Sequence, residues 1–220
     1  MIFKNRQEAG KLLGLLLKDK LQAKEALVLG LPRGGIVVAY EVAKILGTPL
    51  DILCARKIGA PFNQELAIGA ISAEGAFYLF RDLIERLHVS QDYIDTAKLH
   101  AMAEAKRQLD LYRPGKKPLC LNNTVAIIVD DGLATGATMR VALLEAKQLG
   151  AKKIIMAIPV APIDTFHDLE KFSDQSFCLQ LPTDFSSVGQ FYADFSQTPD
   201  EEVMFLLEKE HGSQSGNNTK

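Results

Sequence analysis

Apolar and polar positions along this chain follow two alternating patterns. Short apolar runs have the length and composition of buried strands, and they lie at residues 26–29, 50–55, 125–129, 153–160 and 176–181. Around them, apolar residues recur at helical spacing in segments 6–20, 36–46, 82–111, 139–149, 161–172 and 200–209. Strands that alternate with helices predict an α/β fold, with a parallel-sheet core and flanking helices.

A different strand pattern lies between residues 58 and 80. Two β-leaning runs, Leu66–Ser72 and Ala76–Phe80, flank the turn residues Glu74 and Gly75. This arrangement is typical of a hairpin, so we expect a hairpin arm beside the core. The last residues, 210–220, are polar and should form a disordered tail after a single domain over residues 1–209.

Composition and net charge limit the classes of protein to which this chain can belong. A chain of 220 residues, 47% hydrophobic and 24% charged, suits one globular α/β domain. Its net charge of −2 gives no broad positive field, so we expect no nucleic-acid and no membrane partner. The three cysteines, odd in number and far apart, are Cys54, Cys120 and Cys178. They suggest neither a disulfide framework nor a metal site, and this favours a reducing, cytoplasmic location. The apolar run near the N-terminus is too short to span a membrane.

The stretch Val125–Met139 carries the strongest chemical signal. An apolar strand is followed by Asp130 and Asp131, by a loop of small residues and by the start of a helix. Free backbone N–H groups at a helix start bind anions, and small residues let a phosphate approach them closely. The two carboxylates would repel that anion, but they can accept hydrogen bonds from sugar hydroxyls. The stretch therefore predicts a ribose phosphate ligand, and it matches neither the P-loop nor the dinucleotide motif.

A second strand, loop and helix unit precedes this stretch in the chain. Its loop, Gly-Leu-Pro-Arg-Gly-Gly at residues 30–35, places the cation Arg33 inside a glycine-rich turn. If the two strands are neighbours in a parallel sheet, both loops face one cleft. A basic pair, Arg56 and Lys57, follows the strand at 50–55 and would suit a further phosphate contact. Taken alone, the loop at residues 30–35 is more typical of a plain glycine-rich turn. A basic pair such as Arg56 and Lys57, taken alone, usually lies in a solvent-exposed turn.

The stretch Val125–Met139 resembles the phosphoribosyl diphosphate (PRPP) motif of type I phosphoribosyltransferases, in which a Thr-Gly-x-Thr loop follows two acids. Together with the Pro-Arg-Gly-Gly loop and the later Phe-Tyr-Ala-Asp-Phe segment, it is similar to a bacterial branch of that family whose acceptor is uncharacterised. The resemblance covers residues 1–209 and implies a flexible arm at about 58–80 and a small hood at about 181–200. It also implies transfer of a phosphoribosyl group from PRPP to a nucleobase-like nitrogen acceptor, with release of pyrophosphate and Mg²⁺ as cofactor.

The resemblance further implies roles for individual residues. Asp130, Asp131, Arg33 and Lys57 would be catalytic. PRPP would be bound by Pro32, Arg33, Gly34, Arg56, Lys57, Asp130, Asp131, Gly132, Ala134, Thr135, Gly136, Ala137 and Thr138. Mg²⁺ would be held mainly by substrate and water rather than by a protein metal site. Phe191 and Tyr192 of the hood would contact the acceptor, and the Pro32–Arg33 peptide bond would be cis.

Two other functions fit the same residues. A PRPP-binding regulatory or sensor protein would keep the donor site without turnover, and a hydrolase would cleave PRPP or a related sugar phosphate with water. Some family members are regulators that bind RNA, and the net charge of −2 argues against that activity here. The sequence leaves open the acceptor, the oligomeric state, for which a homodimer is one expectation, and the roles of Glu65, Tyr112 and Arg113.

Overall fold

A computed structural model describes residues 1–21 and 25–215 of the chain. Its core is a parallel sheet of five strands in the order β2-β1-β6-β7-β8. The strands are β1 (Ala26–Gly30), β2 (Leu50–Ile52), β6 (Val125–Val129), β7 (Lys153–Val160) and β8 (Gln175–Gln180). The predicted fold class, α/β with a parallel-sheet core, is confirmed.

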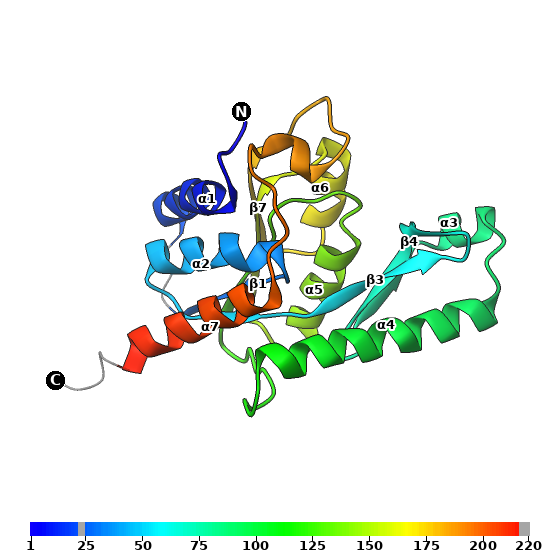
Figure 1. Cartoon of the computed structure of the whole chain (residues 1–220), viewed down its shortest axis with the longest axis horizontal. Helices are drawn as coiled ribbons and strands as arrows, with labels where there is room; N and C mark the ends of the chain where they lie inside the picture. Colours follow the sequence, from blue (N-terminus) through cyan, green and yellow to red (C-terminus); the bar gives the residue numbers. More distant parts are fainter. Residues whose placement is uncertain (22–24, 216–220) are drawn as a thin grey trace.

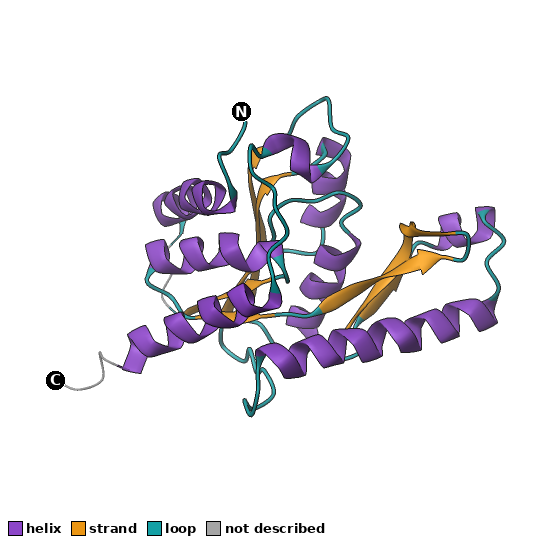
Figure 2. Ribbon diagram, in the orientation of Figure 1, coloured by secondary structure: helices purple, strands orange, loops and turns teal. Residues whose placement is uncertain are grey.

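Helices cover both faces of this sheet (Figure 2). One face is covered by α1 (Arg6–Lys20), α2 (Gly34–Leu46) and α7 (Asp200–Ser215), and the other by α5 (Ala137–Gln148) and α6 (Ile163–Glu170). The last helix extends beyond its predicted end at residue 209, and residues 216–220 of the expected tail lie outside the described part. Because helices lie on both faces, the central strands must be apolar throughout, as their sequences are.

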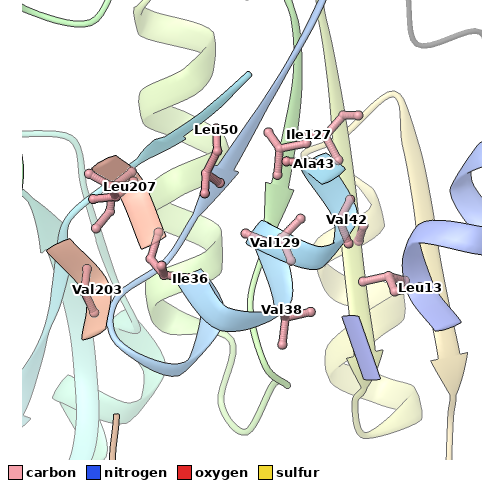
Figure 3. Close-up of a cluster of buried hydrophobic side chains, with 14 of the residues drawn as sticks. Leu13, Ile36, Val38, Val42, Ala43, Leu50, Ile127, Val129, Val203 and Leu207 are labelled. Carbon is pink, nitrogen blue, oxygen red and sulfur yellow. The ribbon is translucent and has the colours of Figure 1, made fainter. Parts of the chain in front are cut away.

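Strand β6 shows how the two halves of the core are built. Ile127 and Val129 point to the side of α2, where Figure 3 shows them among Val38, Val42 and other buried side chains. The alternate residues of β6 join the cluster beneath α5 and α6. Since β6 is apolar on both faces, it holds the Asp130–Asp131 pair at a fixed point on the sheet edge.

The strand order places the two glycine-containing loops side by side. From β1 the chain passes through α2 to β2 on one side, whereas β6 lies on the other side of β1. Gly30 at the end of β1 is in register with Val129 at the end of β6. The edge between β1 and β6 is therefore a topological switch point, where open α/β sheets bind their ligands.

A second, antiparallel sheet of three strands forms the arm, which extends away from the core in Figure 1. It consists of β3 (Ala55–Ala60), β4 (Asn63–Ser72) and β5 (Phe77–Leu79), followed by α3 (Arg81–Arg86) and α4 (Gln91–Tyr112). The predicted hairpin is present as β4 and β5. The predicted strand at 50–55 is wrong in one respect, because it splits into β2 and β3, so that Arg56 and Lys57 lie inside a strand of the arm.

The arm has a small apolar core of its own. Ile58 and Ile68 pack toward Ile94 of α4, and Ala67 and Ala70 pack against α5. The connection from β3 to β4 is different, because Phe62 at its tip is 96% exposed and the first four residues of β4 are also exposed. If part of the arm is a mobile lid, this exposure favours the tip.

We expect hydrogen exchange in the ligand-free protein to be fast at residues 61–66 and slow in the buried half of β4, because the tip is exposed whereas that half of β4 is packed in the arm's apolar core. PRPP should slow exchange at the tip. Mass-spectrometric hydrogen exchange measures both, with the buried strand β6 as the internal reference. Slow exchange at 61–66 without ligand would contradict a mobile lid.

Glu145 of α5 is a buried acid behind the arm. It is 2% exposed, and its Oε2 atom has no hydrogen-bond partner among the described residues. Burial raises the pKa of Glu145 from 4.5 to about 8; a hydrogen bond from Ser72 opposes this shift and the charge of Glu74 adds to it. The unfolded chain ionises near the ordinary value. Between these two pH values the folded state thus holds one proton more, and stability falls as the pH rises.

We expect the free energy of unfolding to fall by roughly 2–4 kcal/mol between pH 5 and pH 8 on account of this group. Glu145→Gln should remove most of that fall, because an amide does not ionise. Chemical unfolding at the two pH values measures the difference, and Glu201→Gln, at an exposed position in the first turn of α7, is the control. If the free energy of unfolding depends on pH in the same way in Glu145→Gln and in the native sequence, Glu145 is not the cause of the fall.

Candidate active site

The loops after β1 and β6 pack directly against each other. The backbone N–H of Leu31 donates to the carbonyl oxygen of Val129 at 2.9 Å. A Cβ atom on Gly34 would collide with Oδ2 of Asp131, and one on Gly35 would lie 2.7 Å from Oδ1 of Asp130. The two glycines are therefore required for the close approach of the two carboxylates to the start of α2.

Asp130 and Asp131 lie at the C-terminal end of β6, as predicted. Oδ1 of Asp130 accepts the backbone N–H of Asp131 at 2.8 Å. Burial, together with the neighbouring carboxylate, raises the pKa of Asp130 well above its usual range. Burial also raises the pKa of Asp131, and the guanidinium of Arg6 opposes that shift. A partner that supplies hydrogen-bond donors or positive charge stabilises the ionised form of two carboxylates this close together.

Arg6 is a site residue that the sequence alone did not reveal. Its Nε atom donates to Oδ2 of Asp131 at 2.7 Å, and one of its terminal nitrogens donates to the carbonyl oxygen of Ser196 at 2.7 Å. The guanidinium also stacks on the ring of Phe195, 3.9 Å from the ring centroid. Arg6 thus links α1, the hood and the acid pair. A ligand hydroxyl bound by Oδ2 of Asp131 must share or replace this contact.

The loop from Gly132 to Thr138 has the features of the predicted phosphate cradle. Gly136 has φ of 69° and precedes the first residue of α5. Gly132 is closely covered by Val188, since a Cβ atom there would lie 2.5 Å from a methyl carbon of that residue. Ala134 and Thr135 are exposed, and Ala137 is the buried first residue of the helix. Backbone N–H groups at a helix start can bind an anion, and phosphate binding by this loop stays a prediction.

Arg33 precedes α2, and the Pro32–Arg33 peptide bond is cis, as predicted. The guanidinium lies 3.8 Å from Oδ1 of Asp200 at the start of α7. The hydroxyl of Tyr112 donates to the same oxygen at 2.6 Å. Arg33 is about one-third exposed, so it stays accessible at the loop while Asp200 and Tyr112 orient it.

The structure gives contacts to the residues whose roles the sequence left open. Tyr112 contacts Asp200, as described above. Arg113 forms a bidentate, largely buried ion pair with Asp51 of β2, at 2.9 and 3.1 Å. This pair fixes the end of α4 to the core sheet.

Arg56 and Lys57 lie on the arm strand β3, where each has an acidic neighbour. Lys57 pairs with Glu65 at 2.5 Å, and Arg56 lies 4.0 Å from Glu104. Both line a cavity of about 370 Å³ whose other residues belong to the arm strands and α4. A pyrophosphate contact from either residue stays a prediction.

Phe191 and Tyr192 are placed differently from what acceptor stacking requires. They are 8% and 6% exposed and pack with Phe3 and Val160. The hydroxyl of Tyr192 donates to the backbone carbonyl of Asp131 at 2.6 Å. In this conformation, both rings fasten the hood to the N-terminal segment, and neither has an uncovered face for a base. The contact with the acid pair makes Tyr192 a support for the site.

The acid pair fits the coordination chemistry of Mg²⁺. This ion is often bound by one or two carboxylates together with substrate phosphate oxygens and water, and Asp130 and Asp131 are two adjacent carboxylates at the start of the loop 132–138. Within residues 1–21 and 25–215, no cluster of three or more His, Cys, Asp or Glu residues could hold a metal ion. Over the same residues, every helix is too short or too polar to cross a membrane.

Residues 2–196 match the family described as the phosphoribosyl transferase domain. The chain belongs to this family. Two curated Mycobacterium tuberculosis proteins, from strains CDC 1551 and H37Rv and each provisionally named a phosphoribosyl transferase, are 40% identical to it over 210 residues and 96% of this chain. The phosphoribosyl transferase chain described here spans about half of their length, 47%.

Solved structures agree with the family assignment at the level of the fold. The crystal structure of the TT1426 protein from Thermus thermophilus is 35% identical, with a TM-score of 0.79, and the match covers 95% of this chain and 99% of that one. The AQ2163 protein from Aquifex aeolicus is 13% identical, with a TM-score of 0.52, over 92% and 86% of the two chains. The first of these thus matches the phosphoribosyl transferase chain over nearly all of its length.

Proposed function

We propose that this phosphoribosyl transferase uses PRPP as its donor and transfers the phosphoribosyl group to a nitrogen atom of a small, nucleobase-like acceptor. One observation carries the proposal: the acid pair and a phosphate cradle adjoin the Arg33 loop at the switch point of the sheet. A sugar diol, a 5′-phosphate and a pyrophosphate need these three features together. A cytoplasmic location is part of the proposal and rests on the three free cysteines.

Each part of the site contributes a separate interaction. The backbone N–H groups of residues 134–138 hold the 5′-phosphate, so that binding energy from a non-reacting group orients the sugar. Asp130 and Asp131 accept hydrogen bonds from the ribose hydroxyls and lie near the positive charge that develops on the sugar. The acceptor nitrogen forms a bond to C1 as the bond from C1 to pyrophosphate breaks and the electron pair leaves with pyrophosphate.

The leaving pyrophosphate carries high negative charge. Arg33 stabilises it, and Lys57 and Arg56 add to this if the arm closes. Mg²⁺, bound beside Asp130 and Asp131 and mainly to substrate oxygens and water, would neutralise part of that charge. Closure of the arm tip would also exclude water from the reactive sugar.

A turnover assay tests the proposal directly. The full chain is incubated with PRPP, Mg²⁺ and a panel of nitrogenous bases, and release of pyrophosphate is followed. Release that requires one base supports the transferase. Release without any base would instead identify a hydrolase, and PRPP binding without release would identify a sensor.

We expect Arg33→Ala to weaken binding of PRPP and of pyrophosphate about tenfold or more, because a charge-assisted contact to the leaving group is lost. Ribose 5-phosphate should bind almost as before, since its phosphate uses the other loop. Calorimetric titration of the three ligands measures this, with Lys44→Ala as the control at an exposed position on the same helix. Equal losses for all three ligands would contradict the assignment of Arg33 to pyrophosphate.

A further inference from the structure

The arm packs against α5, the helix that begins at the phosphate loop (residues 132–138), through an interface of small side chains. The buried cluster at this interface contains one valine and five alanines: Val141, Ala55, Ala67, Ala70, Ala76 and Ala137. Stabilisation by apolar burial is roughly proportional to the area removed from water, and an alanine side chain buries little area. Small side chains also interlock little, so other contacts must fix the place of the arm on the helix.

Arg140 of α5 joins the arm to the core at this interface. Its guanidinium lies 4.4 Å from the centroid of the Tyr78 ring and 5.9 Å from that of the Phe80 ring, both on the arm. It also lies 4.7 Å from the ring centroid of Phe172, which packs on the core cluster beneath α5 and α6. At these distances a guanidinium is attracted to the face of an aromatic ring. Arg140 therefore connects two rings of the arm with one ring of the core.

The surroundings of Arg140 are unusual for a cation. Its Nε atom is buried and has no hydrogen-bond partner within residues 1–21 and 25–215. A buried donor without a partner lowers the stability of the folded state. An uncharged side chain of similar length, such as methionine, would fill the same space without this cost. Stability alone therefore does not explain a guanidinium at this position, whereas attraction to three rings does.

The arm rings that Arg140 contacts lie close to the phosphate loop. Tyr78 and Phe80 line a cavity of about 570 Å³ that is also lined by Thr135 of the loop. Arg140 itself lies in the first turn of α5, and its backbone N–H donates to the carbonyl oxygen of Gly136 at 2.9 Å. The same residue thus contacts the arm through its side chain and the loop through its backbone. A shift of the arm along α5 would change the distance between the arm and the loop.

We propose that Arg140 is a positioning residue, whose guanidinium fixes the arm beside the phosphate loop by holding Tyr78 and Phe80 to the core. The inference rests on the proposed function in one respect, that the arm carries Arg56 and Lys57 toward the pyrophosphate of PRPP. Ribose 5-phosphate has no pyrophosphate, so its binding does not depend on the position of the arm. Loss of the Arg140 contacts should therefore weaken the binding of PRPP alone.

Hydrogen exchange and calorimetric titration of the full chain test the proposal. Arg140→Met removes the charge at similar length, Tyr78→Leu removes one ring, and Tyr78→Phe keeps that ring. In the first two variants, exchange at residues 77–83 of the ligand-free chain should be about fivefold or more faster, because contacts that hold the arm are lost. Both variants should bind PRPP about fivefold or more weakly and ribose 5-phosphate as tightly as the native chain. Tyr78→Phe should match the native chain in all three measurements.

The double variant Arg140→Met/Tyr78→Leu separates positioning from a general loss of stability. If Arg140 acts through the ring of Tyr78, the double variant should match Arg140→Met in exchange and in PRPP affinity, because the same contact is already lost. Two independent losses of stability would instead add. Lys147→Met is the control, since it removes one positive charge from an exposed position on the same helix, and it should match the native chain.

The proposal is overturned if exchange at residues 77–83 in Arg140→Met is no faster than in Lys147→Met, or if the effects of the two substitutions add in the double variant. It is also overturned if Arg140→Met binds PRPP as tightly as the native chain, or if ribose 5-phosphate weakens as much as PRPP. Failure of the proposed function looks different. In that case PRPP and ribose 5-phosphate would not bind the native chain, and exchange in the arm would still support or overturn its positioning by Arg140.

Discussion

Asp130→Asn/Asp131→Asn should abolish PRPP binding that is measurable by calorimetry and lower pyrophosphate release by about 10³-fold or more. An amide can still accept one hydrogen bond, but it cannot offset positive charge on the sugar or attract Mg²⁺. Both carboxylates lie at the point where β6 ends, beside the phosphate cradle. They are the acidic groups that adjoin both loops of the site.

The fold should tolerate this double substitution. Burial already favours the neutral form of Asp130, so loss of charge there removes an unfavourable term. Loss of the Asp131 charge leaves Arg6 with the Ser196 carbonyl and the Phe195 ring. Thermal melting should therefore shift by only a few degrees. Asp110→Asn, at an exposed position on α4, is the control for PRPP affinity. Unchanged affinity in the double variant would refute the assignment of the acids to the ribose hydroxyls.

The parts of the fold that depend on local pattern could be predicted from the sequence. β6 and β7 have their predicted bounds because β6, and β7 after Lys153, are apolar runs buried on both faces. Asn5 caps α1 and Ser90 caps α4, since in each case the side chain accepts a backbone N–H three residues on. The two loops could be placed together because parallel neighbours present the same end to one edge.

Contacts between residues far apart in the sequence could not be predicted in this way. Arg6 and Asp131 are 125 positions apart, and Tyr112 and Asp200 are 88 apart. No periodicity or local motif specifies such pairs, because they depend on how α1, α4 and α7 are packed. The burial of Phe191 and Tyr192 has the same origin. A cluster of aromatic residues in the sequence does not distinguish a ring that packs on Phe3 from one that awaits a ligand.

The Arg6 contacts suggest how the hood and the acid pair act together. The N-terminal segment is joined to the hood by hydrogen bonds between Phe3 and residues 191 and 193. Arg6, three residues further on, brings positive charge to Asp131. The hood therefore affects the donor site through Arg6 as well as through the Tyr192 hydroxyl.

The second large effect is expected for Gly34→Ala, which should lower turnover about 10²-fold while leaving the fold intact. The new Cβ atom would collide with Oδ2 of Asp131 and lie 2.5 Å from Nε of Arg6. Both are ends of flexible side chains, so they move rather than the backbone. Gly34 lies in the first turn of α2, where alanine is favoured over glycine by up to about 1 kcal/mol. The free energy of unfolding should thus change by less than about 1 kcal/mol.

Gly35→Ala is the matched comparison, because its Cβ atom would lie 2.9 Å from Cα of Asp130 and 3.1 Å from the carbonyl oxygen of Val129. These are backbone atoms of the central sheet edge and cannot move aside freely. Gly35→Ala should therefore destabilise the protein by about 1–3 kcal/mol, which chemical unfolding measures alongside PRPP titration of both variants. If Gly34→Ala loses as much stability as Gly35→Ala, the clash lies with the backbone. If instead Gly34→Ala binds PRPP and turns over normally, the position of the Asp131 carboxylate does not control the reaction.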